Sequence, residues 1–240
     1  MTHICDLEVG VHVEEDAIDW QDWEQEFYDE MSGALLDPAK VAKARKTEIA
    51  YAKTFEVYEK VDAELARGKK NISVRWVDLN KGDEANPDYR SRLVARELKK
   101  LDPFMTGTFA ATPPLETLKF MLSWLMTKTR RNGKLLRKKA LFLDASRAHW
   151  HVKCERELYI DLPDEDWEEG KVGRLKKMLY GTRDASAGWE AFYTKAFCDL
   201  DFTQGEWCPC LFHHAERDLV AWVHGDDKII VGEQADLEWF

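Results

Sequence analysis

The chain has 240 residues, of which 45% are hydrophobic and 12% aromatic, including ten tryptophans. This composition excludes an entirely disordered protein and is enough for one substantial core. No stretch approaches the roughly 20 apolar residues of a membrane span, and the N-terminus lacks the pattern of a secretory signal. Five irregularly spaced cysteines then indicate an intracellular, reduced protein with no membrane partner.

The formal net charge of −10 hides a strong segregation of charge along the chain. Residues 1–39 carry twelve acids and no Lys or Arg, residues 40–140 carry 24 Lys and Arg against 12 acids, and residues 141–240 carry 11 against 21. A basic block can neutralise phosphates, and an acidic block can gather metal ions. For each block taken alone, the solubility of a charged surface is an equal explanation.

The first half of the chain reads as a leader, a helix and a hairpin. Residues 1–38 form an acidic leader. Its aromatic residues favour a segment that docks on a surface and its acidic composition favours disorder, and the two alternatives are equal. The apolar spacing over 39–68 predicts a helix that stops at Gly68, and alternation predicts strands at 71–79 and 89–98. The basic side chains of this hairpin are Arg75, Lys81, Arg90, Arg92 and Arg96.

The second half mixes helices and short strands. After the break at 112–114, an apolar stripe predicts a helix over 115–126, and 132–133 is a turn signal. The further elements expected are strands at 141–144 and 157–163, an acidic loop at 164–170, an apolar-basic stretch at 172–179 and a helix at 185–200. Their irregular alternation indicates an α+β fold class rather than a regular series of parallel βαβ units.

Carboxylates at the ends of apolar strands are the main chemical signal. An apolar run leads into Asp226 and Asp227 and another leads out, which predicts strand–turn–strand, and Asp144 ends an earlier apolar strand. If both strands share a sheet, three carboxylates converge, and two such charges about 4 Å apart repel by about 4 kcal/mol at an effective dielectric of about 20. Divalent cations would neutralise them. Taken alone, however, Asp226 and Asp227 are better explained as a solvated turn, because Gly-Asp is ordinary turn chemistry.

Mg²⁺ suits such a cluster, with Mn²⁺ as a substitute, because it takes few carboxylates and completes its shell with water and phosphate oxygens. Two ions about 3.5–4 Å apart would activate a hydroxyl and stabilise a leaving phosphate. The sequence therefore points to metal-dependent phosphoryl chemistry if the strands are neighbours.

Two other motifs are weaker. The glycine turn at 180–186 leads into a helix, whose N-terminus can bind a phosphate, although a plain loop-to-helix turn explains it better. Cys208, Cys210, His213 and His214 supply zinc-ligand chemistry. However, Cys-x-Cys is too short for the usual knuckle, and adjacent histidines on a strand point to opposite faces. Buried strand cysteines are the favoured interpretation.

Eight short motifs follow one another in a fixed order. They are GKKNISVRW at 68–76, YRSRLVAR at 89–96, ATPPLETL at 111–118, FLDASRAH at 142–149, ELYIDLP at 157–163, LYGTRDASAGW at 179–189, CLF at 210–212 and VHGDD at 223–227. Their order and spacing resemble the reverse transcriptase domain of copia-like LTR retrotransposons over about residues 40–240. No single motif is decisive, but eight in this order are hard to produce by chance.

The resemblance implies a right-hand polymerase whose antiparallel palm sheet is flanked by helices. It divides the chain into the leader 1–38, a fingers-like region 39–135 and a palm-like region 136–240. Two-metal nucleotidyl transfer is then assigned to three residues that are both catalytic and metal-ligating: Asp144, Asp226 and Asp227. The residues implied to bind substrate are Arg90 and Arg92 at the triphosphate, Gly181 against template and nucleotide, and His149 against the sugar.

The resemblance also implies partners and a wider context. The partners are an RNA or DNA template with its primer, dNTPs, and the remainder of a polyprotein that carries the thumb, RNase H and integrase. Since the chain stops soon after the catalytic hairpin, processive synthesis by this fragment alone is not expected. The expected location is intracellular, in the cytoplasm, in a particle or in the nucleus.

The chain departs from the family pattern at several places. His224 stands where the family usually has Tyr, and His149 stands at the aromatic position that excludes a ribose 2′-hydroxyl. Asp184 and Ser186 replace the usual Gln and Pro, and Asp184 is expected to weaken triphosphate binding. Two alternatives therefore stay open: a non-catalytic remnant that only binds nucleic acid, and an RNA-dependent RNA polymerase, which also uses Gly-Asp-Asp.

Overall fold

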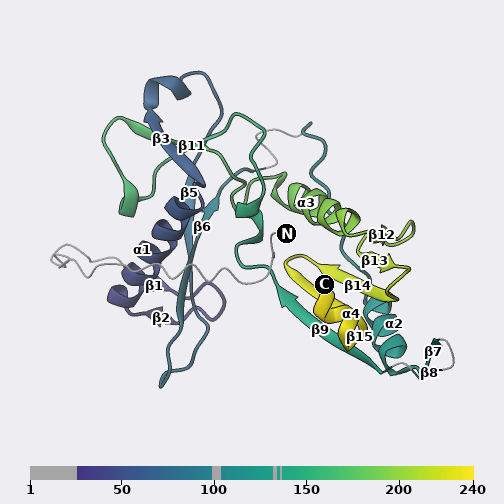
Figure 1. Cartoon of the computed structure of the whole chain (residues 1–240). Helices are drawn as coiled ribbons and strands as arrows, with labels where there is room; N and C mark the ends of the chain where they lie inside the picture. The colour runs from purple at the N-terminus through teal and green to yellow at the C-terminus, as the bar shows by residue number, and fades with distance from the viewer. Residues whose placement is uncertain (1–25, 99–103, 132–133, 136) are drawn as a thin grey trace. The chain divides into compact units, whose positions relative to one another are not determined.

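The computed structural model describes residues 26–98, 104–131, 134–135 and 137–240 of the chain (Figure 1). These residues form two compact units. The first unit comprises 106–148 and 186–240, and the second comprises the described residues up to 105 together with 149–185. Helices and several sheets are mixed in the chain, as the sequence indicates. Among the described residues no helix has the length and apolar character needed to cross a bilayer.

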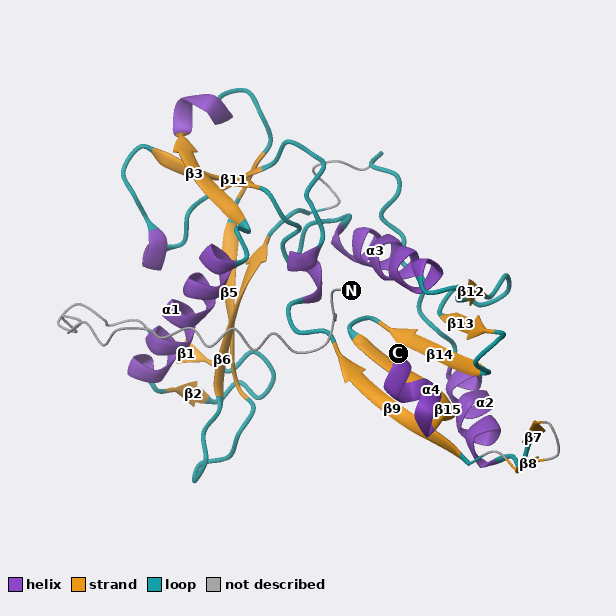
Figure 2. Cartoon of the chain, in the orientation of Figure 1, coloured by secondary structure: helices purple, strands orange, loops and turns teal. Residues whose placement is uncertain are grey.

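The first unit is built on an antiparallel five-stranded sheet (Figure 2). The strand order is β12 (Thr203–Gln204), β13 (Leu211–His214), β14 (Leu219–His224), β15 (Asp227–Glu233) and β9 (Lys138–Asp144). The helices that accompany it are α2 (Leu115–Met126), α3 (Ala185–Asp199) and α4 (Gln234–Trp239). A short hairpin pairs β7 (Arg130–Arg131) with β8 (Lys134–Leu135).

Helices cover both faces of this sheet. Met121 of α2 is fully buried against Trp222 and Val231, and burial of a side chain of this size stabilises the fold by about 1.5–3 kcal/mol. On the opposite face, Phe197 of α3 stacks on Phe212 with ring centroids 4.6 Å apart. The predicted helices over 115–126 and 185–200 are therefore confirmed within a residue.

The second unit combines a helix, a four-stranded sheet and two hairpins. The sheet order is β3 (Tyr58–Asp62), β11 (Lys171–Leu175), β10 (Tyr159–Ile160) and β4 (Asn71–Ile72). The hairpins are β1 (Phe27–Tyr28) with β2 (Leu35–Leu36) and β5 (Val74–Asn80) with β6 (Tyr89–Ala95). The helical segments are α1 (Pro38–Thr54), η1 (Ala63–Ala66), η3 (Ala148–His151, whose first residue belongs to the other unit) and η4 (Asp164–Asp166).

Helix α1 begins as the sequence dictates but ends earlier than predicted. Asp37 caps it by accepting hydrogen bonds from the amides of Ala39 and Lys40, the usual role of an N-cap aspartate. The prediction of one helix over 39–68 is wrong beyond Thr54. Glu56 turns the chain with φ of +51°, and the next residues pair with β11 along the whole of β3. Pairing with a distant strand thus overrides local helical spacing.

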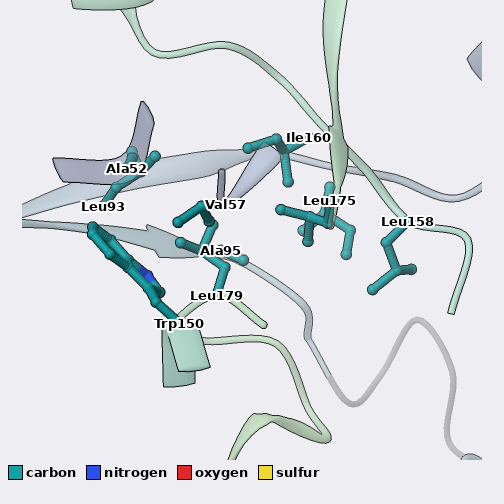
Figure 3. Close-up of a cluster of buried hydrophobic side chains, with 10 residues drawn as sticks. Ala52, Val57, Leu93, Ala95, Trp150, Leu158, Ile160, Leu175 and Leu179 are labelled. Atoms are coloured by element: carbon teal, nitrogen blue, oxygen red, sulfur yellow. The ribbon is translucent and has the colours of Figure 1, made fainter. Parts of the chain in front are cut away.

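A cluster of ten buried apolar side chains forms the core of the second unit (Figure 3). Its members are Ala52, Val57, Ile72, Leu93, Ala95, Trp150, Leu158, Ile160, Leu175 and Leu179. They come from the helix, the four-stranded sheet, the β5–β6 hairpin and the segments that connect them. The cluster therefore joins segments that lie far apart in the sequence into one packed body.

The strand predicted at 71–79 is divided into β4, which belongs to the four-stranded sheet, and β5, which pairs with β6 in the predicted hairpin; the strand predicted at 89–98 ends at Ala95. The buried Asp78 of β5 accepts two hydrogen bonds from Arg45 of α1, at 2.6 and 3.2 Å. The strand predicted at 157–163 is reduced to β10. The turn signal at 132–133 and most of the acidic leader lie outside the described residues.

Candidate active site

The β14–β15 hairpin ends in a two-residue turn made by Gly225 and Asp226. Gly225 has φ of +64°, whereas Asp226 keeps a negative φ. A glycine with positive φ at the first position is the mark of a type II′ turn, which matches the twist of its strands. The predicted strand–turn–strand is confirmed, and Asp227 is the first residue of β15.

Asp144 and Asp227 are brought together by the sheet. In the antiparallel pairing of β15 with β9, Asp227 lies directly opposite Asp144, and in the pairing with β14 it lies opposite His224. Residues directly opposite on neighbouring strands point to the same face, with Cβ atoms about 4.5–5.5 Å apart. Two carboxylates and one imidazole therefore share one face at one end of the sheet.

This end of the face is open to solvent. Asp144, Asp227 and His224 are exposed, and Asp226 is half-buried. Among the described residues, no group of three or more His, Cys, Asp or Glu side chains is arranged to hold a metal ion. Two adjacent, exposed carboxylates nevertheless fit Mg²⁺, which commonly takes one or two protein carboxylates and otherwise binds water and phosphate oxygens.

The turn is held by three groups that the sequence did not single out. The indole Nε1 of Trp189 donates to the carbonyl of Gly225 at 2.8 Å. The carbonyl of Asp226 accepts from the Ala145 amide at 3.0 Å and from the Lys228 ammonium at 3.1 Å. Trp189 lies in the helix predicted over 185–200, and nothing in the sequence of that helix reveals the indole hydrogen bond.

Gly181 occupies a position in the second unit that only glycine fits. Its φ is +82°, and a Cβ there would lie 2.1 Å from the carbonyl oxygen of Ala95 and 2.7 Å from a methyl group of Val94. The amide of Ala95 also bonds the carbonyl of Tyr180 at 2.7 Å. The Leu-Tyr-Gly motif is therefore docked against the end of β6.

An aromatic and basic cluster lies beside Gly181 in the same unit. The guanidinium of Arg92 lies over the ring of Tyr180, 5.3 Å from its centroid. The ring of His149 meets the same tyrosine edge to face at 4.6 Å. Arg90, on the same strand face as Arg92, is exposed and bonded to Asp88 at 2.9–3.0 Å. The four residues expected to bind substrate thus lie in one unit, and three of them are close to Tyr180.

The charge of Asp184 is compensated within the second unit. Its carboxylate accepts hydrogen bonds from Arg156 at 2.6 and 2.7 Å. The other side of the same guanidinium holds the buried Glu97, which also accepts from Lys70 and from the Arg183 amide. The sequence led us to expect that Asp184 weakens triphosphate binding, and its pairing with Arg156 reduces the repulsion that a phosphate would meet.

The Glu97 carboxylate has a strongly perturbed pKa. Burial raises the pKa, but the hydrogen bonds from Arg156, Lys70 and the Arg183 amide outweigh burial and lower it to about 2. Only 1% of this side chain is exposed. A carboxylate held by several donors is a strong structural anchor, and this one secures the segment that precedes α3.

The possible zinc motif does not form a metal site. His213 is exposed and His214 is buried, so the two imidazoles point to opposite faces of β13, as the alternation of a strand requires. His214 packs edge to face against the rings of Phe202 and Trp239. Burial raises the pKa of Cys210 to about 11, so the thiol is protonated in the metal-free protein.

Comparison with known proteins identifies the family. The family model described as reverse transcriptase (RNA-dependent DNA polymerase) matches residues 55–238. Since this is well over half of the chain, the chain belongs to the reverse transcriptase family. Among curated proteins, the transposon Ty1-NL2 Gag-Pol polyprotein of Saccharomyces cerevisiae is 33% identical over 91 residues, which are 37% of this chain and 5% of that relative. The copia-like resemblance seen in the motifs is confirmed.

Proposed function

We propose that this chain is a fragment of an RNA-directed DNA polymerase, carrying the fingers and palm of a right-hand fold, from a retrotransposon polyprotein. The observation that carries the proposal is the register of Asp144 with Asp227 at the open end of the sheet. Membership of the reverse transcriptase family supports it. The proposed palm-like region is 136–240 and the fingers-like region 39–135, whereas the first compact unit takes in 106–148 and 186–240.

The catalytic side of the proposal rests on three carboxylates. Asp144, Asp226 and Asp227 would hold Mg²⁺, or Mn²⁺ in its place, through their exposed or half-buried oxygens. When bound, a pair of such ions activates the attacking hydroxyl and stabilises the leaving phosphate. The carboxylates themselves keep the ions at a fixed place on the sheet, because their backbones belong to a hydrogen-bonded ladder and its turn.

The substrate side of the proposal rests on the second unit. Arg90 and Arg92 would bind the triphosphate, since a guanidinium matches phosphate oxygens with paired donors. His149 would lie against the sugar, and Gly181 would allow close approach of the base or template, because it has no side chain. The proposed partners are dNTPs, an RNA or DNA template with its primer, and the remainder of the polyprotein, inside the cell.

The test is metal-dependent nucleotide incorporation on a defined primer–template. The wild type is compared with the Asp226→Asn, Asp227→Asn double variant and with Asp199→Asn, an exposed carboxylate change in the same unit. We expect incorporation by wild type and Asp199→Asn with Mg²⁺ or Mn²⁺, and a loss of at least a thousandfold in the double variant. Equal incorporation by all three proteins would refute the assignment of the carboxylates.

A second candidate is a non-catalytic remnant that only binds nucleic acid. It is favoured by one observation, that no three metal-ligating side chains in the described part of the chain are grouped to hold a metal. The same assay separates the two functions. A wild-type protein that binds primer–template with strong salt dependence but incorporates no nucleotide with either metal supports the remnant.

A further inference from the structure

The Gly225–Asp226 turn is anchored by hydrogen bonds on the side that faces away from the carboxylates. A type II′ turn has two central carbonyls, and both are engaged here: that of Gly225 by Trp189, and that of Asp226 by Ala145 and Lys228. In addition, the Lys228 ammonium lies 4.9 Å from the centroid of the Trp189 ring. Helix α3, the turn, β15 and the residue that follows β9 thus meet at this one point.

These anchors lie on the face opposite to the carboxylates. Lys228 follows Asp227 in β15, so the two side chains point to opposite faces of the sheet, and the contact of Lys228 with Trp189 shows which face α3 covers. Trp189 is buried, with 4% of its surface exposed. The anchors are therefore shielded from the solvent-exposed end of the opposite face, where a substrate would bind.

Such anchoring has a direct physical consequence for the opposite face. The end of a hairpin opens easily when its turn carbonyls are solvated, because no further ladder bond lies beyond them. Here the Ala145 bond ties the turn to the residue after Asp144, so the turn and the end of β9 move as one. Metal-ion catalysis demands this, since displacements of the order of 1 Å at reacting groups can cost about a hundredfold in rate.

We propose that Trp189 and Lys228 are positioning residues that fix the Gly225–Asp226 turn from below and so set the spacing of the carboxylates for metal binding. Trp189 supplies a rigid indole donor carried by α3, and Lys228 supplies a donor that is itself held over the indole ring by a cation–π contact. This inference rests on the proposed function for its catalytic meaning, but its structural content concerns the turn alone.

Hydrogen exchange and Mn²⁺ affinity test the inference without an activity assay. Trp189→Phe keeps an aromatic ring and removes the donor, so amide exchange should accelerate at least tenfold over 144–146 and 225–228, and the Mn²⁺ dissociation constant should rise at least threefold. Lys228→Met should change both quantities in the same direction. Lys228→Arg, which keeps a charged donor, should stay within twofold of the wild type.

Thr117→Val is the matched control. It removes the acceptor of another indole hydrogen bond in the same unit, from Trp222 Nε1 to Thr117 Oγ1 at 3.0 Å. A merely structural role for Trp189 predicts that both variants lose similar stability and exchange alike at the turn. We expect instead that Thr117→Val leaves exchange over 225–228 and Mn²⁺ affinity at wild-type values.

Two results would overturn the inference: equal exchange at the turn in Trp189→Phe and Thr117→Val, or faster exchange with unchanged Mn²⁺ affinity. If Trp189→Phe does not fold, the Lys228→Met and Lys228→Arg pair decides by the same criteria. A wild type that incorporates no nucleotide, while Lys228→Met still weakens Mn²⁺ binding, would refute the polymerase proposal and leave the positioning role standing.

Discussion

Asp227 lies directly opposite Asp144 across the β15–β9 ladder, although the two residues belong to separate motifs of the sequence. Like charges that face each other on neighbouring strands destabilise a sheet by a few tenths of a kcal/mol to about 1 kcal/mol. The metal-free protein therefore carries a local repulsion at this end of its sheet, and a divalent ion would relieve it.

Removing one of these charges is expected to stabilise the metal-free protein. We predict that Asp227→Asn raises Tm by about 1–4 °C in the presence of a chelator, at the usual 2–4 °C per kcal/mol for a chain of this size. Excess Mg²⁺ should then raise Tm of the wild type through its binding to the native state and leave the variant unchanged. Differential scanning calorimetry with and without Mg²⁺ measures both effects. Asp199→Asn should behave as the wild type does, and a metal response preserved in Asp227→Asn would contradict the prediction.

Gly181 gives a sharper test of the second unit, because its surroundings forbid a side chain. We predict that Gly181→Ala destabilises the protein by about 3 kcal/mol or more, since strain at positive φ adds to a clash of its Cβ with the Ala95 carbonyl. Gly170 is the control, because its φ is +72° but no atom lies within 4 Å of the place that a Cβ would occupy. Gly170→Ala should therefore cost only about 1–2 kcal/mol. Urea denaturation of both variants measures the difference, and equal losses would show that the clash is relieved by movement of β6.

The sequence predicted those parts of the fold whose signal is local. The apolar runs around Gly225 and the stripe over 115–126 are each decided by neighbours in the chain, and both were predicted correctly. The strand β3 was missed because its partner is β11, where Asp62 pairs with Lys171 more than a hundred residues later. The spacing of apolar residues, which favours a helix in isolation, carries no information about a pairing strand so far along the chain.

The sequence predicted which carboxylates belong to the candidate site, but it did not predict the groups that hold them in place. Motif order located Asp144 and Asp227, and the sheet places them in register. The groups that hold them were not predictable, because a tryptophan on an apolar helix face is explained equally well by burial alone. The link from Lys70 through Glu97 to Arg156 likewise joins three separate segments, each of which reads locally as ordinary surface charge.

Because of Glu97, the free energy of unfolding is expected to depend on pH over a defined acidic range. The pKa of Glu97 is lowered from 4.5 to about 2 in the folded state, so its contribution is fully present above about pH 4.5 and is lost as pH falls through about 2. A shift of this size corresponds to a contribution on the order of 3 kcal/mol at neutral pH. We predict that Glu97→Gln lowers the free energy of unfolding by this order at pH 7. The deficit relative to the wild type should shrink toward zero between about pH 4.5 and 2.

The measurement is denaturant unfolding across pH 2–7 for the wild type, Glu97→Gln and Glu64→Gln. Glu64 is an exposed carboxylate on η1 of the same unit, and its substitution should leave the curve unchanged. A deficit in Glu97→Gln that is constant with pH would mean that packing, rather than the charge of Glu97, holds Arg156 and Lys70 in place.

His149 offers a test of sugar selection that also addresses the RNA polymerase alternative. Its ring packs edge to face against Tyr180 at 4.6 Å, and an imidazole is smaller and more polar than a phenyl ring. We predict that His149→Phe raises the preference for dNTP over rNTP by about tenfold, within the 1–3 kcal/mol that a pocket contact of this kind commonly supplies. Single-nucleotide incorporation with paired dNTP and rNTP substrates gives the ratio of kcat/KM values.

His151→Phe, on the same short helix, is the control and should leave the ratio unchanged. A wild type that already prefers rNTPs, with no response to His149→Phe, would favour the RNA-dependent RNA polymerase over the reverse transcriptase.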